Sequence, residues 1–332
     1  MNILVIGLGS MGKRRVRNLQ FLGVKNIRAY DPQPERAALA AEKYGIQTTS
    51  SFDEAWGWPV DAVVISTPPD KHMEYARKAC AAGRHFFIEA SVVDDGIGEL
   101  IEQMKGKSLV AAPSCTMRFH PGIRQMKELV DAGEIGPILN FTYHLGQYLP
   151  DWHPWEDYRT FYVSKRETGA AREMVCFELV WLAWLLGQPN LISCMKGKLT
   201  TLDTDIDDAY QILIRTEKGA LGHLMIDVIS RVPYRTIRLV SENGLIEWSW
   251  TDQIVRLWKA GADGWQDMPE PPQSSEPGYV AAEDMYREEM AAYLAAIRGE
   301  TPWPHSLEDD LRILDLLAAA ERSSDEGRHV AV

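Results

Sequence analysis

The chain has 332 residues, of which 45% are hydrophobic and 25% charged. This composition is typical of a globular protein that is long enough to form two domains. The formal net charge of −12 at pH 7 disfavours nucleic acid and anionic membrane surfaces as main partners.

Residues 1–115 alternate short apolar runs with stretches in which apolar residues recur at helical spacing. The predicted strands are residues 3–6, 27–30, 62–66, 86–88 and 109–112. The predicted helices between them are residues 12–22, 34–44, 52–56, 71–82 and 97–104. Strands and helices that alternate with short connections predict a doubly wound α/β domain, in which helices cover both faces of a parallel sheet.

The pattern changes after Pro113, and residues 116–332 are predicted to form a second, α+β domain. Strand-like runs follow one another from residue 191 to 257, and turn pairs such as Lys218-Gly219 and Asn243-Gly244 separate some of them. This pattern predicts an antiparallel sheet. We also expect a strand at 138–144, a surface loop at 261–278, and helices at 121–132, up to Gly187, at 282–297 and at 307–323.

The compartment is predicted from three features. The longest apolar stretch, residues 174–186, is too short to span a bilayer and contains Glu178, so it predicts a buried helix. The start, "MNILVIG", enters a strand directly, with no basic region or cleavage site typical of a signal peptide. Without a C-x-x-C spacing, the cysteines predict buried thiols and a cytoplasmic protein that does not bind membranes. They are Cys80, Cys115, Cys176 and Cys194.

A glycine-rich motif joins the first predicted strand to the first helix. It reads Gly7-Leu8-Gly9-Ser10-Met11-Gly12. In a dinucleotide-binding Rossmann domain the first glycine allows a tight turn, the second lets the backbone approach the pyrophosphate, and the third lets helix and strand pack closely. The following basic run, Lys13 to Arg15, adds positive charge nearby or is simply solvated on a helix surface.

Asp31 predicts which dinucleotide binds. It lies at the end of the second predicted strand, nineteen residues after Gly12. A carboxylate there can accept both ribose hydroxyls of NAD and repel the 2′-phosphate of NADP. Arg36 could reach such a phosphate and weaken this preference. The alternative is that Asp31 only caps the turn into the next helix. We expect NAD, with NADP less favoured.

The chain resembles the glucose–fructose oxidoreductase / inositol dehydrogenase (Gfo/Idh/MocA) family over nearly its whole length. The segments that carry the resemblance are "VIGLGSMGKRR", "VVISTPPDKHMEYARKACAAGRHFFIEAS", "MRFHPGIRQMKELVDAGEIGPI", "SENGLIEWSW" and "PWPHSLEDDLRILDLLAAAERSSDEGRHVAV". The resemblance implies a second domain with a large, open-faced, predominantly antiparallel sheet. It also implies that the exposed face of this sheet supports a homo-oligomer, a dimer or tetramer.

The same resemblance implies further cofactor contacts. The T-P-x-x-x-H element and the A-G-x-H-x-x-x-E element lie along the nicotinamide end of the cofactor groove in this family. The implied contacts are Ser66, Thr67, Pro68, His72, Glu89 and Ala90. The family's usual chemistry is hydride transfer between a sugar or polyol carbinol and the nicotinamide, as part of carbohydrate metabolism.

The chain departs from the family at the residues that handle protons. The lysine of the family's E-K-P motif is replaced by Ala90, and the histidine of its D-x-x-x-H pair by Phe177, with Glu173 in place of the aspartate. Neither alanine nor phenylalanine can carry a proton. Three functions therefore stay open: an oxidoreductase with a non-standard site, a non-redox NAD-assisted epimerase or lyase, and a catalytically silent NAD-binding sensor or partner.

The aromatic segment of residues 146–170 offers replacements for the lost groups. Lys165 could supply the cation, Tyr162 or His153 could carry the proton, and Glu173 could act as a base or orient another group. Alternatively, Tyr158 and Tyr162 only pack on the sheet and His153 only caps a turn. Two further polar residues, His144 and Glu178, are expected to hydrogen-bond or to form an ion pair within the fold.

The substrate is expected to be a carbohydrate derivative that carries negative charge, such as an acidic or nucleotide-linked sugar. Aromatic faces suit a sugar ring and cations suit its anionic group. The expected substrate-binding residues are Trp152, Trp155, Tyr158, Arg118, Arg166 and Arg172, with His120 beside them. We expect no metal, because His153, Glu156 and Asp157 match no zinc spacing and the aspartates at 205, 207 and 208 fit a solvated turn.

Overall fold

The computed structural model describes residues 1–153, 156–274, 276 and 282–332, and these form two compact units. Unit 1 consists of Met1–Thr116 and Ser274–Leu311, and unit 2 of Met117–Gln273 and Arg312–Val332. The chain thus first passes from unit 1 to unit 2 after Thr116, next to the expected boundary at residue 115. The stretch Ser274–Leu311, which we expected in the second domain, packs instead with the first.

Unit 1 is built on a six-stranded parallel sheet with the order β3-β2-β1-β4-β5-β6. Its strands are β1 (Asn2–Ile6), β2 (Asn26–Tyr30), β3 (Gln47–Thr49), β4 (Ala62–Ile65), β5 (His85–Ile88) and β6 (Ala111–Pro113). The order reverses between β1 and β4, which is where ligands bind in such sheets. The predicted doubly wound fold is confirmed, and the short strand β3 is an addition that the sequence pattern missed.

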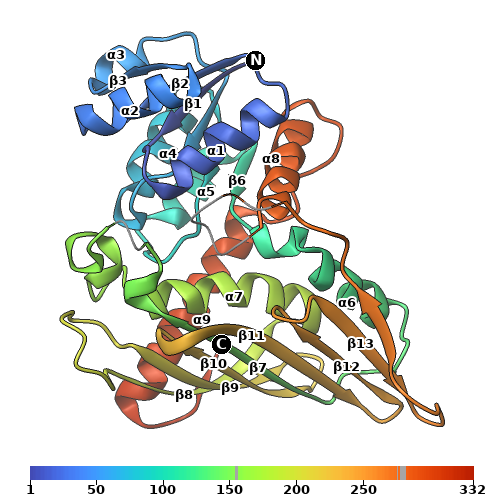
Figure 1. The fold of residues 1–332 in the computed structure, drawn as a ribbon. Coiled ribbons are helices and arrows are strands. Elements are labelled where there is room, and N and C mark those ends of the chain that lie inside the picture. The colour runs from blue at the N-terminus through green and yellow to red at the C-terminus, as the bar shows by residue number, and fades with distance from the viewer. Residues whose placement is uncertain (154–155, 275, 277–281) are drawn as a thin grey trace. The chain divides into compact units, whose positions relative to one another are not determined.

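Six helices of unit 1 are α1 (Ser10–Phe21), α2 (Pro34–Tyr44), α3 (Phe52–Trp56), α4 (His72–Ala81), α5 (Ile97–Met104) and α8 (Asp284–Ile297), with the short 3-10 helix η1 (Pro69–Lys71). Helix α8 lies beside α1 although more than 260 residues separate them in sequence (Figure 1). Its buried Met290, Tyr293 and Leu294 complete the core around the first strands. The C-terminal part of the chain therefore stabilises the N-terminal domain.

Unit 2 contains a nine-stranded sheet with the order β14-β13-β12-β11-β7-β10-β9-β8-β15. The strands are β7 (Asn140–Tyr148), β8 (Pro189–Gly197), β9 (Ala209–Thr216), β10 (Leu221–Asp227), β11 (Ile229–Ser241), β12 (Gly244–Ser249), β13 (Ile254–Lys259), β14 (Gln266–Pro269) and β15 (Val330–Ala331). Strands β7 and β10 pair in parallel and the other pairs are antiparallel. The sheet is thus predominantly antiparallel, as expected, although β14 lies inside the stretch predicted as a loop.

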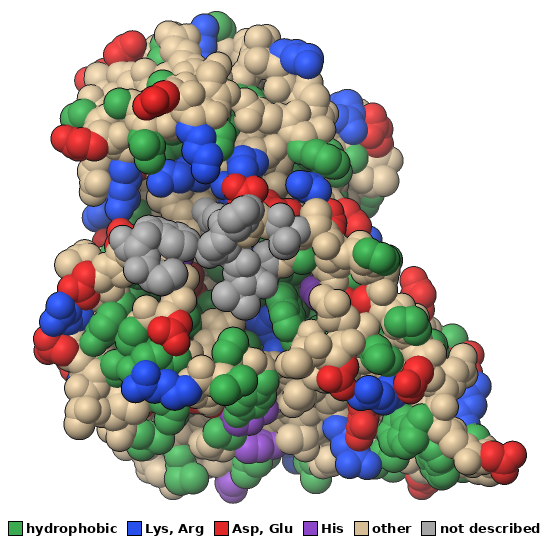
Figure 2. All heavy atoms as spheres, in the orientation of Figure 1, with side chains coloured by type: hydrophobic (Ala, Val, Ile, Leu, Met, Phe, Trp, Pro, Cys, Tyr) green, Lys and Arg blue, Asp and Glu red, His purple; other side chains and the backbone are tan. Residues whose placement is uncertain are grey.

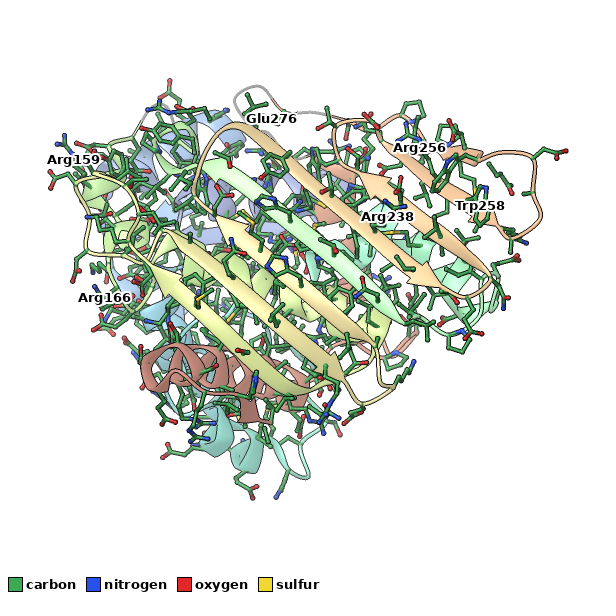
Figure 3. All side chains as sticks on the ribbon, turned by 90° about the horizontal axis from the view of Figure 1, so that it is seen from below. Arg159, Arg166, Arg238, Arg256, Trp258 and Glu276 are labelled. Atoms are coloured by element: carbon green, nitrogen blue, oxygen red, sulfur yellow. The ribbon has the colours of Figure 1, made fainter. Side chains whose placement is uncertain are left out.

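One face of this sheet is covered by helices and the other is open. Unit 2 holds α6 (Pro121–Asp131), α7 (Ala170–Leu186) and most of α9 (Leu307–Glu326), while η2 (Thr116–Phe119) lies at the crossing between the units. Along β7, Phe141, Tyr143 and Leu145 are buried, whereas Thr142 and His144 alternate with them on the opposite face. Figure 3 looks onto this opposite face, where the strands lie in front of the helices.

The described residues of the aromatic segment after β7 include three short 3-10 helices. They are η3 (Leu149–Asp151), η4 (Tyr158–Thr160) and η5 (Tyr162–Ser164). Their turns are closed locally, for example by the Asp157 carboxylate, which accepts from the Arg159 backbone N–H at 3.0 Å. Within the ranges that the structure describes, no helix is both long enough and apolar enough to cross a bilayer.

Candidate cofactor and substrate sites

The glycine loop follows β1 and leads into α1, with two positions that no side chain could occupy. Gly7 has a φ of +92°, and a Cβ built on it would lie 2.4 Å from the Ser66 carbonyl oxygen. A Cβ on Gly12 would lie 1.8 Å from the Gly7 carbonyl oxygen. A Cβ on Gly9 would meet no described atom within 4 Å, so the backbone there is open to a ligand. These are the three roles expected of the motif.

The backbone N–H groups at the start of α1 can hold an anion. The helix begins at Ser10, with Met11 in its first turn, and Gly9 caps it without a side-chain hydrogen bond. The first N–H groups of a helix have no partner within the helix, and its dipole favours negative charge there. This arrangement suits the pyrophosphate of a dinucleotide.

Asp31 is buried at the end of β2 and holds the glycine loop. Its carboxylate accepts from the Leu8 backbone N–H at 2.7 Å and from the Gln33 N–H at 2.9 Å. The second bond is the turn cap that the sequence offered as an alternative. The first bond was not predicted, and it connects the end of β2 to the glycine loop.

The segments after β4 and β5 lie on the other side of the switch point. Ser66 donates to Oε1 of Glu89 at 3.0 Å. The His72 ring lies 2.9 Å from the Thr67 carbonyl oxygen through Nε2, and its burial lowers the pKa of the imidazole. A buried, neutral ring bound to the backbone indicates that His72 shapes this loop. Pro68 precedes η1, and Ala90 is half-buried after Glu89.

Two arginines of the basic run are not solvated. Arg14 and Arg15 are buried, and their side chains bind carboxylates that follow them by many residues. Arg14 donates to Glu283 at 2.8 Å, and Arg15 donates to both oxygens of Glu89 at 2.7 and 2.8 Å. The solvated-surface interpretation is therefore wrong for these two residues, because α8 and β5 cover this side of α1.

In unit 2, two of the four predicted catalytic side chains come together. Tyr162 begins η5, and its phenolic oxygen donates to Oε1 of Glu173 at 3.1 Å. Glu173 lies in the first turn of α7 and is half-buried. The close packing of Gly169 brings η5 to the start of α7, since a Cβ there would lie 2.8 Å from the Lys165 carbonyl oxygen.

The other two predicted catalytic residues are placed differently. The Lys165 side chain is exposed, while its backbone N–H donates to the Tyr162 carbonyl at 3.1 Å. The His153 ring stacks on Phe161 at a centroid distance of 5.3 Å, and its Nδ1 lies 3.6 Å from Oε2 of Glu156. Lys165 thus stands at the surface and His153 packs within the aromatic segment.

The predicted substrate cations all have partners inside unit 2. Arg118 donates to the Val180 carbonyl at 3.1 Å. Arg166 is exposed and binds Asp205 at 2.7 Å, and Arg172 binds Glu321 of α9 at 2.6 Å. Among the predicted aromatic residues, Trp152 and Tyr158 are half-buried, and Trp155 lies outside the described residues.

His120 does not supply the positive charge that its place beside Arg118 suggested. Its ring is buried at the start of α6, with Trp248 and Trp250 at centroid distances of 5.2 Å each. Burial, with a smaller contribution from the Arg235 cation, lowers the pKa of His120 to about 3. The imidazole is therefore neutral at physiological pH, and its Nδ1 accepts from the Gly122 N–H at 3.2 Å.

Two polar clusters hold the sheet and α7 in place. Glu178 binds Arg235, as the ion-pair interpretation predicted, and also accepts from Tyr143 and Trp181 at 2.6 Å each. On the open face, His144 lies 2.9 Å from Asp227, which confirms it as a hydrogen-bonding residue of the fold. A glutamate within an apolar helix was the signal for the first cluster, but nothing in the sequence identified Arg235 as its partner. Among the described residues no group of three His, Cys, Asp or Glu could hold a metal ion.

Comparison with known proteins identifies the family. Residues 1–95 match the model of an oxidoreductase family with an NAD-binding Rossmann fold, and residues 123–247 match the GFO/IDH/MocA C-terminal domain. The chain belongs to the Gfo/Idh/MocA family. Unit 1 therefore contains the NAD-binding Rossmann fold of this family, in agreement with the glycine loop and Asp31.

Two curated relatives are a polyol and a sugar dehydrogenase by name. The chain is 30% identical over 227 residues to "Inositol 2-dehydrogenase 3" of Saccharopolyspora erythraea, a match that covers 65% of the chain and 63% of that protein. It is 26% identical over 270 residues to "Levoglucosan dehydrogenase" of Pseudarthrobacter phenanthrenivorans, a match that covers 67% of the chain and 66% of that protein. The chain thus matches slightly less than two thirds of the length of these two relatives.

Solved structures agree in fold over the whole chain. A levoglucosan dehydrogenase in complex with NADH has a TM-score of 0.87 at 20% identity and covers 100% of this chain and 99% of that one. An oxidoreductase from Agrobacterium radiobacter, in complex with NAD⁺, L-tartaric acid and magnesium, has a TM-score of 0.86 at 16% identity and covers 100% and 98%. At these identities the likeness establishes the fold.

Proposed function

We propose that this chain is an NAD-dependent oxidoreductase that acts on a CH–OH or carbonyl group of a sugar or sugar derivative. The observation that carries the proposal is the 3.1 Å hydrogen bond between Tyr162 and Glu173. Glu173 occupies the position of the aspartate in the family's D-x-x-x-H pair. A phenol bound to a carboxylate can exchange a proton, which Ala90 and Phe177 cannot do.

When bound, a nicotinamide would supply the hydride donor or acceptor for the substrate carbon. In the oxidative direction, Tyr162 takes the hydroxyl proton as the carbinol becomes a carbonyl, and passes its own proton to Glu173. Reduction reverses both transfers. Lys165, exposed three residues after Tyr162, supplies a cation to the substrate oxygen, and His153 is the second candidate proton carrier.

The cofactor preference is for NAD over NADP. Asp31 is buried at the ribose position, and its carboxylate is fixed by two backbone N–H groups. A fixed negative charge repels a 2′-phosphate, whereas it can accept a hydrogen bond from a ribose hydroxyl. The cofactor contacts expected after β4 and β5 are Ser66, Thr67, Pro68, His72, Glu89 and Ala90.

The substrate we propose is an acidic or nucleotide-linked sugar bound by the aromatic segment and by the cations beside it. The aromatic contacts are Trp152, Trp155 and Tyr158. The cations are Lys165, Arg118, Arg166 and Arg172. Because Arg166 and Arg172 already bind carboxylates, an anionic substrate would have to compete with Asp205 and Glu321.

The chain is further proposed to form a homo-oligomer, a dimer or tetramer, through the open face of the sheet. Large apolar side chains on this face are exposed, among them Met195 at 75%, Leu213 at 58% and Leu221 at 57%. Figure 2 shows histidine side chains beside hydrophobic ones on the lower surface of unit 2. Exposed apolar area of this kind marks interaction surfaces.

The function is tested by identifying the nucleotide released from the purified protein and by following nicotinamide absorbance with a panel of neutral, acidic and nucleotide-linked sugars. We expect the wild type to oxidise or reduce a sugar with a change in nicotinamide absorbance, and Tyr162→Phe to abolish this turnover. If instead a product forms without net change in the nicotinamide, the enzyme is a non-redox one, an epimerase or lyase. Tight NAD binding with no product from any sugar identifies a sensor, and Ala90 and Phe177 are the residues that favour that outcome.

A further inference from the structure

Arg15 is held on several sides in the interior of unit 1. Its side chain is 0% exposed. Nε and Nη2 donate to the two oxygens of Glu89 at 2.7 and 2.8 Å, and Nη1 lies 2.8 Å from Oε2 of Glu289 in α8. The guanidinium also lies over the Phe87 ring, 4.6 Å from its centroid. A two-point arginine–carboxylate pair fixes orientation as well as distance.

Glu289 keeps Arg15 in this position from the other side. Its carboxylate accepts from the Ser114 hydroxyl at 2.9 Å, from the Cys115 N–H at 2.7 Å and from the Thr116 hydroxyl at 2.7 Å. Three donors from neighbouring residues fix the position of this buried carboxylate. Arg15 thus connects a fixed anchor, Glu289, to Glu89.

Glu89 stands at the edge of the sheet where the cofactor is expected. It directly follows β5, and Ser66, which directly follows β4, donates to the same carboxylate. The glycine loop follows β1 and Asp31 follows β2, so the pyrophosphate and one ribose are expected on that side of the switch point. The nicotinamide half must then extend over the ends of β4 and β5.

Ser91 carries a hydroxyl without a partner at this edge. It lies two residues after Glu89, next to Ala90, and is 6% exposed. Its Oγ is buried and makes no hydrogen bond to any described residue. Because a buried hydroxyl without a partner costs free energy, such groups point to a ligand.

We propose that Ser91 binds the nicotinamide end of the cofactor through its hydroxyl, and that Arg15 is a positioning residue that holds the Glu89–Ser91 turn for this contact. The inference rests on the nicotinamide cofactor of the proposed function and is independent of the sugar substrate. Glu89 itself is not the proton carrier here, because Arg15 and Ser66 occupy its carboxylate.

The test compares the dissociation constants of NADH and ADP-ribose, because ADP-ribose keeps the pyrophosphate and the adenine side but lacks the nicotinamide. Ser91→Ala is expected to weaken NADH about tenfold, the effect of one lost hydrogen bond, and to leave ADP-ribose unchanged. Arg15→Lys is expected to do the same, because lysine keeps the charge but not the two-point geometry. Glu289→Gln, which weakens the other ion pair of Arg15, provides a second positioning variant should Arg15→Lys fail to fold.

Arg14→Lys is the matched control. Arg14 is the neighbouring residue of α1, is equally buried, and binds Glu283 in place of Glu89. Arg14→Lys is expected to lower the melting temperature as Arg15→Lys does. Its ratio of NADH affinity to ADP-ribose affinity is expected to equal that of the wild type. An unchanged ratio in Ser91→Ala would overturn the contact, and equal ratios in Arg15→Lys and Arg14→Lys would overturn the positioning role. A wild type that binds NADH no better than ADP-ribose overturns both, whereas NADH binding without sugar turnover contradicts only the proposed function.

Discussion

Arg235 of β11 donates to Glu178 of α7 at 2.7 Å, and their side chains are only 7% and 0% exposed. The same carboxylate accepts from Tyr143 of β7 and from Trp181 one turn further along α7. Burial, together with the Glu178 charge, raises the pKa of Tyr143 well above its usual value, so the phenol stays a donor. The cluster fixes α7, whose first turn carries Glu173, on the central strands of the sheet.

Removal of Arg235 is therefore expected to be costly. Arg235→Met leaves the Glu178 carboxylate buried without its cation, which should lower the free energy of unfolding by about 3–5 kcal/mol. Arg238→Met is the control three residues along the same strand, where the arginine is 55% exposed and lies 3.2 Å from Glu247. The exposed pair should contribute less than about 1 kcal/mol. Urea unfolding measures both, and similar losses in the two variants would contradict this account of the cluster.

Tyr162 and Glu173 are expected to act as one catalytic unit. Tyr162→Phe and Glu173→Gln should each lower kcat by a factor of about 10²–10⁴, the usual contribution of a proton-transferring group. The double variant should lose little more than either single variant, because the effects of coupled residues do not add. Tyr44→Phe in α2 controls for removal of a phenol. Additive losses, or full activity in Tyr162→Phe, would show that the proton takes another route.

Much of unit 1 could be predicted because its signals are local. Strand and helix periodicities, the glycine motif and Asp31 all lie within a few residues of the features that they specify. The return of Ser274–Leu311 to unit 1 could not be predicted in this way, since α8 has the periodicity of any amphipathic helix. Its partner, α1, lies at the other end of the chain.

The candidate site shows the same limit at the level of single residues. Arg14 and Arg15 looked like part of a solvated run because their carboxylate partners are distant in sequence. Glu283 and Glu289 are more than 260 residues away, and Glu89 is 74 residues from Arg15. The local sequence does not indicate pairs between residues so far apart in the chain. Tyr162 and Glu173 were each predicted as candidates, but their hydrogen bond was not, because it depends on the turn at Gly169 that brings η5 to the start of α7.

Asp31 is expected to determine the preference for NAD. Asp31→Asn keeps an acceptor for the Leu8 N–H but removes the negative charge that opposes a 2′-phosphate. The ratio of NAD to NADP affinity should fall about tenfold, as for the loss of one charge–charge interaction near a surface. Asp53→Asn, in the first turn of α3, controls for the change in net charge. An unchanged ratio, measured by titration calorimetry, would mean that Asp31 serves only the loop and the turn.

The open face of the sheet is expected to hold copies of the chain together. Leu213→Glu places a charge at an apolar position of β9 and should convert the oligomer to monomer in sedimentation experiments. Leu39→Glu is the control, because Leu39 is similarly exposed, at 52%, but lies on α2 of unit 1. Its sedimentation should match that of the wild type. Equal behaviour of the two variants would place the association elsewhere.

His120 is expected to make stability depend on pH below neutrality. Its folded-state pKa is lowered to about 3, whereas the unfolded side chain titrates near 6.5. The unfolded chain therefore takes up a proton that the folded chain excludes, and the free energy of unfolding falls as the pH drops through 6.5. One such group contributes about 1.4 kcal/mol per pH unit, or about 2 kcal/mol between pH 6.5 and about pH 5.

The groups that face His120 decide how this is measured. The cation of Arg235 opposes its protonation, while Glu270 lies 3.8 Å away and burial raises the pKa of that carboxyl. Glu270 thus gives an opposite pH dependence, so the effect must be read as the difference between variants.

His120→Asn keeps an acceptor for the Gly122 N–H but does not titrate. It should be less stable than the wild type at neutral pH and lose less stability towards about pH 5. His329→Asn, at an exposed position, should keep the wild-type slope, and equal slopes in all three proteins would mean that folding does not lower the pKa of His120.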